Sequence, residues 1–279
     1  MFERALVPLH LRERRPRVEA VVALLSRLSI HNVRLLHVAG SASGARRAAG
    51  KVETMAREIA AAVDFSDQLT ISAQTVSGSA VSEIIETAVA QEADVIAVPW
   101  KRKNWVQRSL LGSTSLDLIR LADMPVLIQK TSPGRAPESG APLSVMYATD
   151  LKQSDETVFP LIERGALGSI RLTILTAGQR APDPVAEARR VDAAEASLTQ
   201  LAERVRPVVE EVDTVVITGS SRKAIPAYLR WNKFHVAIIG KGSSGSQPIL
   251  GSTAEEVAYR SPGSVLIIPP AVGGEVPRG

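Results

Sequence analysis

The sequence predicts an α/β protein made of two tandem, open, doubly wound domains, each with a five-stranded parallel sheet flanked by helices. Three observations predict this fold class. Short apolar segments of strand length alternate with segments of helical periodicity. The alternation runs through the chain twice, with sequence landmarks in the same order. Aromatic residues make up only 4% of the chain, so Val, Ile, Leu and Ala must build the cores, as in buried parallel sheets.

The first copy begins with the apolar run ALVPL and continues with an amphipathic helix whose apolar residues recur every three to four positions. Two further strands and two further helices follow, and a helix after Gly112 leads into the last strand, VLIQ. The Gly/Ser/Arg-rich stretch after the second strand is expected to be a loop. Strands are predicted at residues 5–9, 33–39, 69–73, 94–98 and 126–129, and helices at 17–28, 52–63, 79–91 and 112–122.

A second copy follows a stretch rich in Pro, Gly and Ser, TSPGRAPESGAP, which has no hydrophobic period and is typical of a linker. Its strands are predicted at residues 144–150, 171–176, 214–218, 235–239 and 265–269, with a long helix at 185–205 and a short one at 222–231. We therefore divide the chain into domain 1 (1–130), a linker (131–142), domain 2 (143–270) and a flexible tail (271–279).

The spacing of two landmarks supports a duplication. The tetrapeptide LGST occurs at Leu111 and again at Leu250, and the tripeptide VLI occurs at Val126 and again at Val265. Both pairs are separated by 139 residues. Two landmarks in one register indicate a tandem repeat of one α/β unit.

Composition limits the class of protein. The chain has 279 residues, 45% hydrophobic and 22% charged, which is typical of a soluble globular protein with two domains. It has no cysteine, which excludes a disulfide scaffold, a thiolate zinc site and a cysteine nucleophile. The sequence shows neither a signal peptide nor an apolar run of about 18 residues. We therefore expect a cytoplasmic protein that does not insert into membranes.

The segments ADVIAV and LLGSTSLDLIRLADMPVLI in the first copy resemble the universal stress protein family, and so does VAIIGKGSSGSQPILGSTAEEVAYRSPGSVLII in the second. The resemblance covers nearly the whole chain. It implies an open five-stranded sheet, pairing through the last strands as an intramolecular pseudo-twofold pair, and a role in the stress response. In one subgroup it implies binding of ATP or AMP at the strand ends, with Mg²⁺ if the ligand is ATP.

The second copy carries most of that subgroup's residues. The subgroup's pattern is Gly, two residues, Gly, nine residues, then Gly and Ser or Thr, after an acid that ends the first strand. Glycines let backbone N–H groups approach phosphate oxygens, and the last Gly-Ser opens a helix whose free amides favour an anion. The resemblance implies adenine near the end of the second strand, ribose near the acid and phosphates over the glycines. The matching positions are Thr176, Asp150, Gly240, Gly242, Gly245, Gly251, Ser252 and Thr253.

The spacing departs from the pattern in the second copy. Gly242 and Gly245 are two residues apart as required, but only five residues separate Gly245 from Gly251. With Gly240 as the first glycine, the second becomes Ser243 and the loop is two residues short. A phosphate cradle is compatible with this loop, whereas the fit of a triphosphate is in question. A Ser or Thr helix cap also occurs without any ligand.

The first copy has the right loop length and the wrong residues. Counting back from Gly112, the two glycine positions hold Pro99 and Arg102, and Leu9 or His10 replaces the acid. Pro lacks an N–H and Arg brings a side chain to a place where backbone should approach the ligand. We expect no ATP binding of the family's kind here, although Gly112, Ser113 and Thr114 could hold a bare anion.

Two other functions stay open. One is a nucleotide-free scaffold that binds a protein partner, for example through the basic loop with Trp100, Lys101, Arg102, Lys103, Trp105 and Arg108. The other is a nucleotide-hydrolysing enzyme, for which the sequence offers no evident general base. The modest net charge of +4 and the lack of a nucleic-acid motif disfavour nucleic acid as a partner.

Other candidate motifs have structural explanations. His10 and His37 fall near strand ends, but no third ligand at metal spacing accompanies them, so they are expected to be hydrogen-bonded structural residues. GARRAAGKV, from Gly44 to Val52, has five residues between its glycines and Val in place of the magnesium-binding Ser or Thr of a P-loop. We interpret it as a loop that leads into a helix.

Overall fold

A computed structural model describes residues 2–62, 69–100, 113–130, 140–241, 243–244, 247–248 and 250–270. The chain divides into two compact units, Phe2–Thr131 and Ser132–Arg278, here called the N-terminal and the C-terminal unit. Of the predicted linker, residues 131–139 lie outside the described part, as does the whole predicted tail at 271–279.

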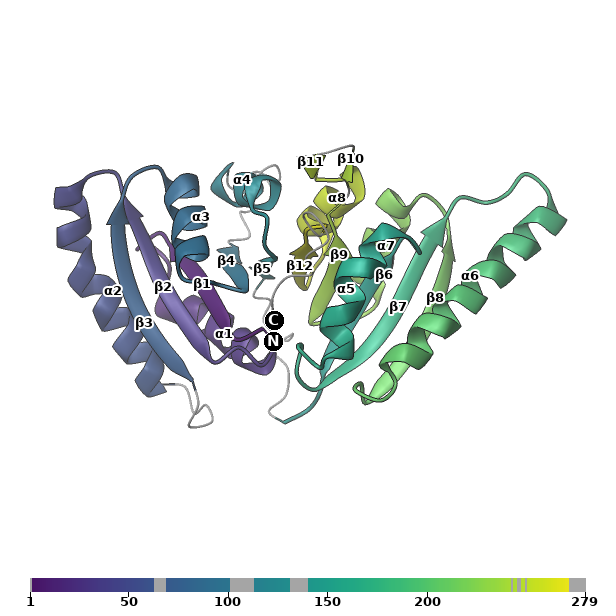
Figure 1. The fold of residues 1–279 in the computed structure, drawn as a ribbon, viewed down its shortest axis with the longest axis horizontal. Helices are drawn as coiled ribbons and strands as arrows, with labels where there is room; N and C mark the ends of the chain where they lie inside the picture. The colour runs from purple at the N-terminus through teal and green to yellow at the C-terminus, as the bar shows by residue number, and fades with distance from the viewer. Residues whose placement is uncertain are drawn as a thin grey trace. The chain divides into compact units, whose positions relative to one another are not determined.

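The N-terminal unit has five parallel strands in the order β3-β2-β1-β4-β5 (Figure 1). The strands are β1 (Arg4–Leu9), β2 (Asn32–Ala39), β3 (Thr70–Ser77), β4 (Val95–Trp100) and β5 (Val126–Lys130). The helices between them are α1 (Arg15–Arg27), α2 (Ala42–Ala62), α3 (Ala80–Ala90) and α4 (Ser113–Leu121). α1 packs with α2 and α3 packs with α4. Right-handed crossovers put these two pairs on opposite faces of the sheet.

The C-terminal unit repeats this topology, with the order β8-β7-β6-β9-β12 and parallel pairing throughout. The strands are β6 (Leu143–Thr149), β7 (Ile170–Gly178), β8 (Glu211–Thr218), β9 (Val236–Gly240) and β12 (Ser264–Ile268). The helices are α5 (Gln153–Glu163), α6 (Pro184–Val205), α7 (Ser221–Trp231) and α8 (Ser252–Arg260). The short strands β10 (Ser243–Ser244) and β11 (Gln247–Pro248) form an antiparallel pair after β9. Two doubly wound α/β units are thus confirmed, and their predicted pairing stays a prediction.

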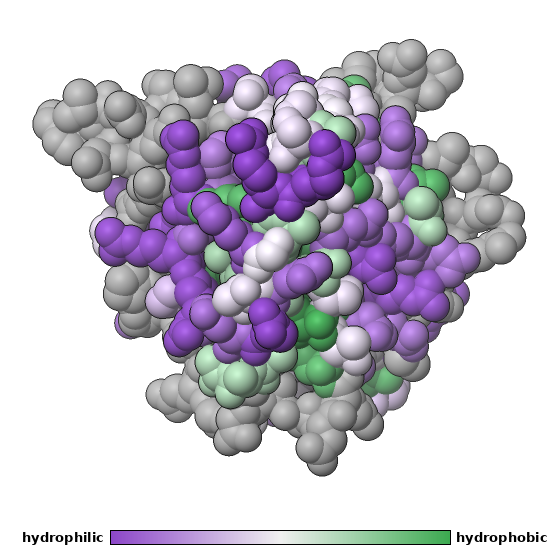
Figure 2. Space-filling model, turned by 90° about the vertical axis from the view of Figure 1, so that its left-hand side faces the viewer, coloured by the Kyte–Doolittle hydropathy of each residue, from purple (hydrophilic) through white to green (hydrophobic). Residues whose placement is uncertain are grey.

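Apolar side chains fill both sides of each sheet. Val7, Leu35 and Ile96 are fully buried in the N-terminal unit, as are Val145 and Ile174 in the C-terminal unit. The outer surface of α2 is polar, and the side of the N-terminal unit that Figure 2 shows is mostly hydrophilic. In the described part of the chain, no helix is both long and apolar enough to cross a membrane.

The helix α5 and the short strands β10 and β11 were not predicted, and α2, β3 and β8 differ from the prediction in their bounds for physical reasons. Residues 42–51, expected as a loop, form the first half of α2, because Ala and Arg favour helix strongly enough to accommodate Gly44 and Gly50. The interpretation of Gly44–Val52 as a helix-leading loop was therefore wrong. The strands β3 and β8 extend beyond the predicted 69–73 and 214–218, because edge strands keep polar residues that hide the apolar alternation.

Candidate functional site

A cavity of about 450 Å³ opens at the carboxyl ends of the strands in the C-terminal unit. Residues from the ends of β6, β7 and β9 line it, together with the first residues of α7 and α8. Between β6 and β9 the strand order reverses, and α/β sheets bind their ligands at this switch point. Six of the eight predicted site residues line the cavity: Asp150, Thr176, Gly240, Gly251, Ser252 and Thr253.

Asp150 follows the last residue of β6 and has a fixed orientation. Its Oδ1 accepts hydrogen bonds from the Ser154 hydroxyl at 2.6 Å and from the Lys152 N–H at 3.1 Å. Leu151 adopts a left-handed backbone conformation with φ 56°, and its N–H donates to Thr149 Oγ1 at 2.7 Å. This turn directs the chain from β6 into α5 and leaves Asp150 exposed at the cavity.

A buried polar network lies beneath this turn. Asp155 Oδ1 accepts hydrogen bonds from the Tyr147 hydroxyl at 2.6 Å and from Thr149 Oγ1 at 2.5 Å. Burial is the main cause that raises the pKa of Asp155, and the nearby charge of Asp150 adds to it. Burial also raises the pKa of Tyr147, whose ring packs edge to face on Phe159 with centroids 5.7 Å apart. The network therefore anchors α5 to the end of β6.

Thr176 and Gly240 complete the floor of the cavity. Thr176 is 7% exposed and donates its hydroxyl hydrogen bond to the Thr149 carbonyl at 3.1 Å. A Cβ on Gly240 would lie 2.6 Å from Ser154 Cβ, so only glycine fits where β9 meets α5. Gly240 thus has a packing role besides its predicted position near a phosphate.

The N-terminus of α8 faces the cavity. Gly251 is its N-cap, with no side-chain hydrogen bond to the first-turn amides, and Ser252 and Thr253 follow. Thr253 Oγ1 lies 3.1 Å from the hydroxyl of Ser221, the first residue of α7. Uncapped first-turn amides and the positive end of the helix dipole attract anions.

Sequence reasoning missed several lining residues, among them the polar Lys241, Ser154 and Ser221. Lys241 is only 5% exposed, and its N–H donates to the Ile268 carbonyl at 2.7 Å. Its position directly after Gly240, at the end of a buried strand, is the sequence feature that could have identified Lys241 as a site residue. Ser154 is the second residue of α5, which was not predicted, and Ser221 is the first residue of α7. The other two predicted site residues, Gly242 and Gly245, lie outside the described part.

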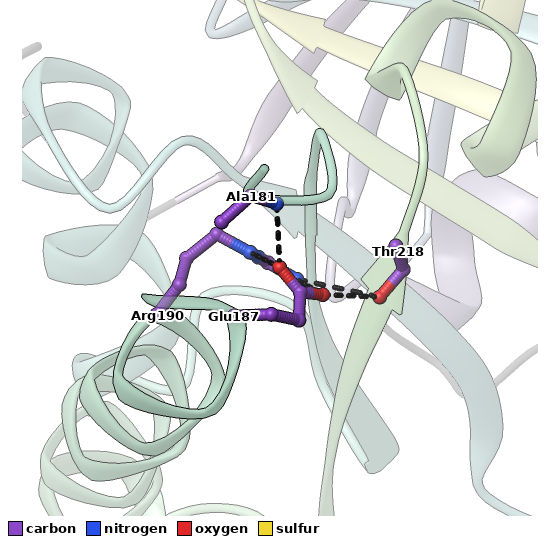
Figure 3. A network of polar contacts seen from close by, with 4 residues as sticks. All are labelled: Ala181, Glu187, Arg190 and Thr218. Carbon is purple, nitrogen blue, oxygen red and sulfur yellow. Dashed lines mark hydrogen bonds and ion pairs between the residues drawn. The ribbon is translucent and has the colours of Figure 1, made fainter. Parts of the chain in front are cut away.

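A second polar network holds the segment that follows β7 (Figure 3). Glu187 accepts hydrogen bonds from Arg190 at 2.8 and 2.9 Å, from the Ala181 N–H at 2.8 Å and from the Thr218 hydroxyl at 3.2 Å. The bonds from Arg190 are the main cause that lowers the pKa of Glu187 to about 2. A Cβ on Gly178 would lie 2.6 Å from Arg190, so the arginine packs closely over the end of β7.

The equivalent strand ends of the N-terminal unit have different chemistry. His10 is exposed, and His37 Nδ1 lies 3.0 Å from the Leu9 carbonyl. Pro99 lies near the end of β4, and Ser113 and Thr114 open α4. Arg102, Gly112 and most of the basic Trp-containing loop lie outside the described residues. Among the described residues of the whole chain, no three His, Asp or Glu side chains come close enough together to hold a metal ion.

Comparisons with known proteins identify the family. A crystal structure of a universal stress protein from Archaeoglobus fulgidus is 21% identical and matches with a TM-score of 0.69, covering 97% of this chain and 98% of its own. A Pseudomonas aeruginosa protein of unknown function is 19% identical with a TM-score of 0.66, covering 96% of this chain and 93% of its own. No curated protein sequence gives a significant match. The model of the universal stress protein family matches residues 1–130 and again 144–269. The chain therefore belongs to the universal stress protein family and carries the family's domain twice.

Proposed function

We propose that the C-terminal unit binds an adenine nucleotide, AMP or ATP, in the cavity at its strand ends, and that the chain acts as a regulatory nucleotide-binding protein of the cytoplasmic stress response. The observation that carries the proposal is the convergence of six motif residues, far apart in sequence, on one cavity. Its volume of about 450 Å³ falls in the usual range for small-molecule sites, about 300–1,000 Å³.

The charges along the cavity fit the two ends of a nucleotide. The Asp150 carboxylate can accept hydrogen bonds from ribose hydroxyls, because Ser154 and Lys152 occupy only one of its oxygens. The first-turn amides of α8 and the Lys241 ammonium would hold phosphate oxygens. Thr176 and Ala177 would border the base. Mg²⁺ would accompany a triphosphate and neutralise part of its charge.

The test starts from the purified full-length chain. After denaturation, released small molecules are identified by mass spectrometry, and ATP, ADP and AMP are then titrated by calorimetry with and without Mg²⁺. We expect binding at one site per chain. We expect Gly251→Val to weaken it by about tenfold or more, since its side chain would block the approach to α8, and Ser252→Ala to weaken it less.

A matched control comes from the N-terminal unit. Ser113 opens α4 as Ser252 opens α8, so Ser113→Ala should leave the affinity unchanged. Equal loss in Ser113→Ala and Ser252→Ala would contradict the assignment to the C-terminal unit. Absence of any nucleotide affinity would favour the nucleotide-free scaffold, and steady turnover of ATP would make the protein an enzyme.

A further inference from the structure

A second hollow lies in the N-terminal unit, at the opposite end of the strands from the family's ligand crevice. Its volume is about 350 Å³, and residues at the amino ends of β1, β2 and β3 line it together with Gln91 and Ala93, which follow α3. The strand register puts Leu6 beside Arg34 and Arg34 beside Ser72. These three side chains therefore share the face of the sheet that α3 covers.

Arg34 is half-buried and has only neutral partners. Its Nε–H donates to Ser72 Oγ at 3.1 Å and one N–H of its outer edge donates to Gln74 Oε1 at 3.3 Å. Gln74 is itself held by a hydrogen bond from Gln91. A guanidinium has five N–H donors, and within the described part of the chain no group accepts the other three. The side chain is therefore oriented by the protein and retains free donors.

The nearby carboxylates are engaged elsewhere. Glu92 forms an ion pair with Arg4, the other charged residue that lines the hollow, at 2.6 Å. Asp94 Oδ2 accepts the backbone N–H groups of Glu3 and Arg4 at 2.7 and 2.8 Å. Among the described residues, no carboxylate lies within ion-pair distance of Arg34. A half-buried cation without a counter-ion is costly, and an anionic ligand would remove that cost.

The C-terminal unit has different neighbours at the amino ends of the corresponding strands. Arg171, the second residue of β7, stands opposite Glu211 on β8, whereas Arg34, the third residue of β2, stands opposite Ser72. The next position on the same face pairs Thr173 with Asp213. The edge strand β8 thus carries two carboxylates beside β7, whereas the edge strand β3 has no charged residue.

We propose that this hollow binds the carboxylate of a small monoanionic molecule, with Arg34 as the anchor. The free edge of a guanidinium matches a carboxylate with two parallel hydrogen bonds. The charge balance favours a monoanion over a phosphate, because Arg4 is already paired and the carbonyl end of α3, near Gln91, carries a partial negative charge. Leu6, on the same face as Arg34, offers an apolar wall for the rest of the ligand.

Methyl NMR of the full chain tests this site directly, since Leu6, Val33 and Ala93 report on the hollow. The probes are sodium acetate, neutral acetamide and inorganic phosphate, titrated at constant ionic strength. We expect saturable shifts of these methyl signals with acetate and none with acetamide. Phosphate binding here more tightly than acetate, or identical shifts with acetate and acetamide, would overturn the proposal.

Three variants test whether the charge of Arg34, and not a change in the fold, is responsible for acetate binding. Arg34→Gln should weaken acetate binding by about tenfold or more, because it removes the positive charge and the two parallel N–H donors of the guanidinium. Ser72→Glu keeps Arg34 but puts a carboxylate opposite it in register, and should weaken binding to the same degree because the new glutamate would pair with the guanidinium. Arg171→Gln is the matched control and should change nothing. Acetate binding that survives both Arg34→Gln and Ser72→Glu in folded protein would refute the site.

Discussion

The two units have one topology and opposite distributions of polar chemistry. In the C-terminal unit the polar residues gather at the carboxyl ends of the strands, where Asp150, Thr176 and Lys241 surround a cavity. In the N-terminal unit Pro99 and His10 take the corresponding region, and the polar hollow lies at the amino ends around Arg34. The two copies of one scaffold thus differ in where their described residues form a polar cavity.

The largest expected difference between the units concerns the helix beneath the cavity. Phe159 on α5 is fully buried, as is Val21 at the similar position of α1. Phe159→Ala should lower the free energy of unfolding by about 3–5 kcal/mol, because its removal leaves a large void under Tyr147. Val21→Ala removes fewer atoms and should therefore lower the free energy of unfolding by less than Phe159→Ala does. Hydrogen exchange measured for each unit checks both, and an equal loss would contradict the comparison.

Two glycine substitutions should change the free energy of unfolding in opposite directions. Gly240→Ala should lower the free energy of unfolding by about 1–3 kcal/mol, because the new Cβ would overlap Ser154. Gly50→Ala, in the middle of α2 with nothing within 4 Å, should raise it by about 0.5–1 kcal/mol. Urea unfolding of both variants gives the answer. A neutral Gly240→Ala would mean that Ser154 can move away freely.

Helix capping provides a smaller contrast. The Asp183 side chain caps α6 by accepting the N–H groups of Val185 and Ala186 at 3.0 and 2.9 Å, whereas Arg14, at the start of α1, makes no cap bond. Asp183→Ala should therefore cost about 1 kcal/mol, and Arg14→Ala should be close to neutral. Thermal unfolding followed by circular dichroism distinguishes them, and similar losses would show that the Asp183 cap contributes little.

The smallest expected effects are two pH dependences of opposite sign in the C-terminal unit. The pKa of Asp155 is raised from its ordinary 3.8, so the folded state holds the proton longer and stability falls as pH rises from about 4 through the raised pKa. The pKa of Glu187 is lowered from 4.5 to about 2, so its contribution is present above 4.5 and is lost as pH falls toward 2. Because the Glu187 side chain keeps partial contact with solvent, its effect should also shrink with salt.

Asp155→Asn and Glu187→Gln separate the two pH dependences. In a plot of the free energy of unfolding against pH, Asp155→Asn should lose the slope caused by Asp155 and keep that of Glu187, and Glu187→Gln should do the reverse. Asn keeps an acceptor for Tyr147 and Thr149, so the fold should tolerate the change. A wild-type slope that persists in Asp155→Asn would assign the titration to another group.

Periodicity and the repeat predicted the topology and most elements, because the buried central strands are continuous apolar runs. Periodicity failed in segments whose apolar residues do not recur at a regular spacing. Pro160 interrupts the pattern of α5, which was therefore not predicted as a helix, although tertiary packing of Val158 and Phe159 holds it. The first half of α2 has few apolar residues and depends on helix propensity alone.

The candidate site was predictable only where a motif marked it. Asp150, Gly251 and Ser252 could be chosen from their positions at a strand end and a helix start. Lys241 was not, because a single lysine carries no periodic signal and its burial depends on the surrounding fold. The Arg34 hollow could not be predicted from the sequence for a similar reason. Its residues come from three strands and become neighbours only through the strand register.

The separate strand order of each unit has a consequence for biosynthesis. Every strand from β1 to β5 comes from the first 130 residues, so the N-terminal unit has its complete sheet before the second half of the chain is translated. Domains fold as units during synthesis, the N-terminal one first. A ribosome stalled late in the second copy would thus carry a folded N-terminal unit, and only the C-terminal unit's strands would remain exposed to chaperones.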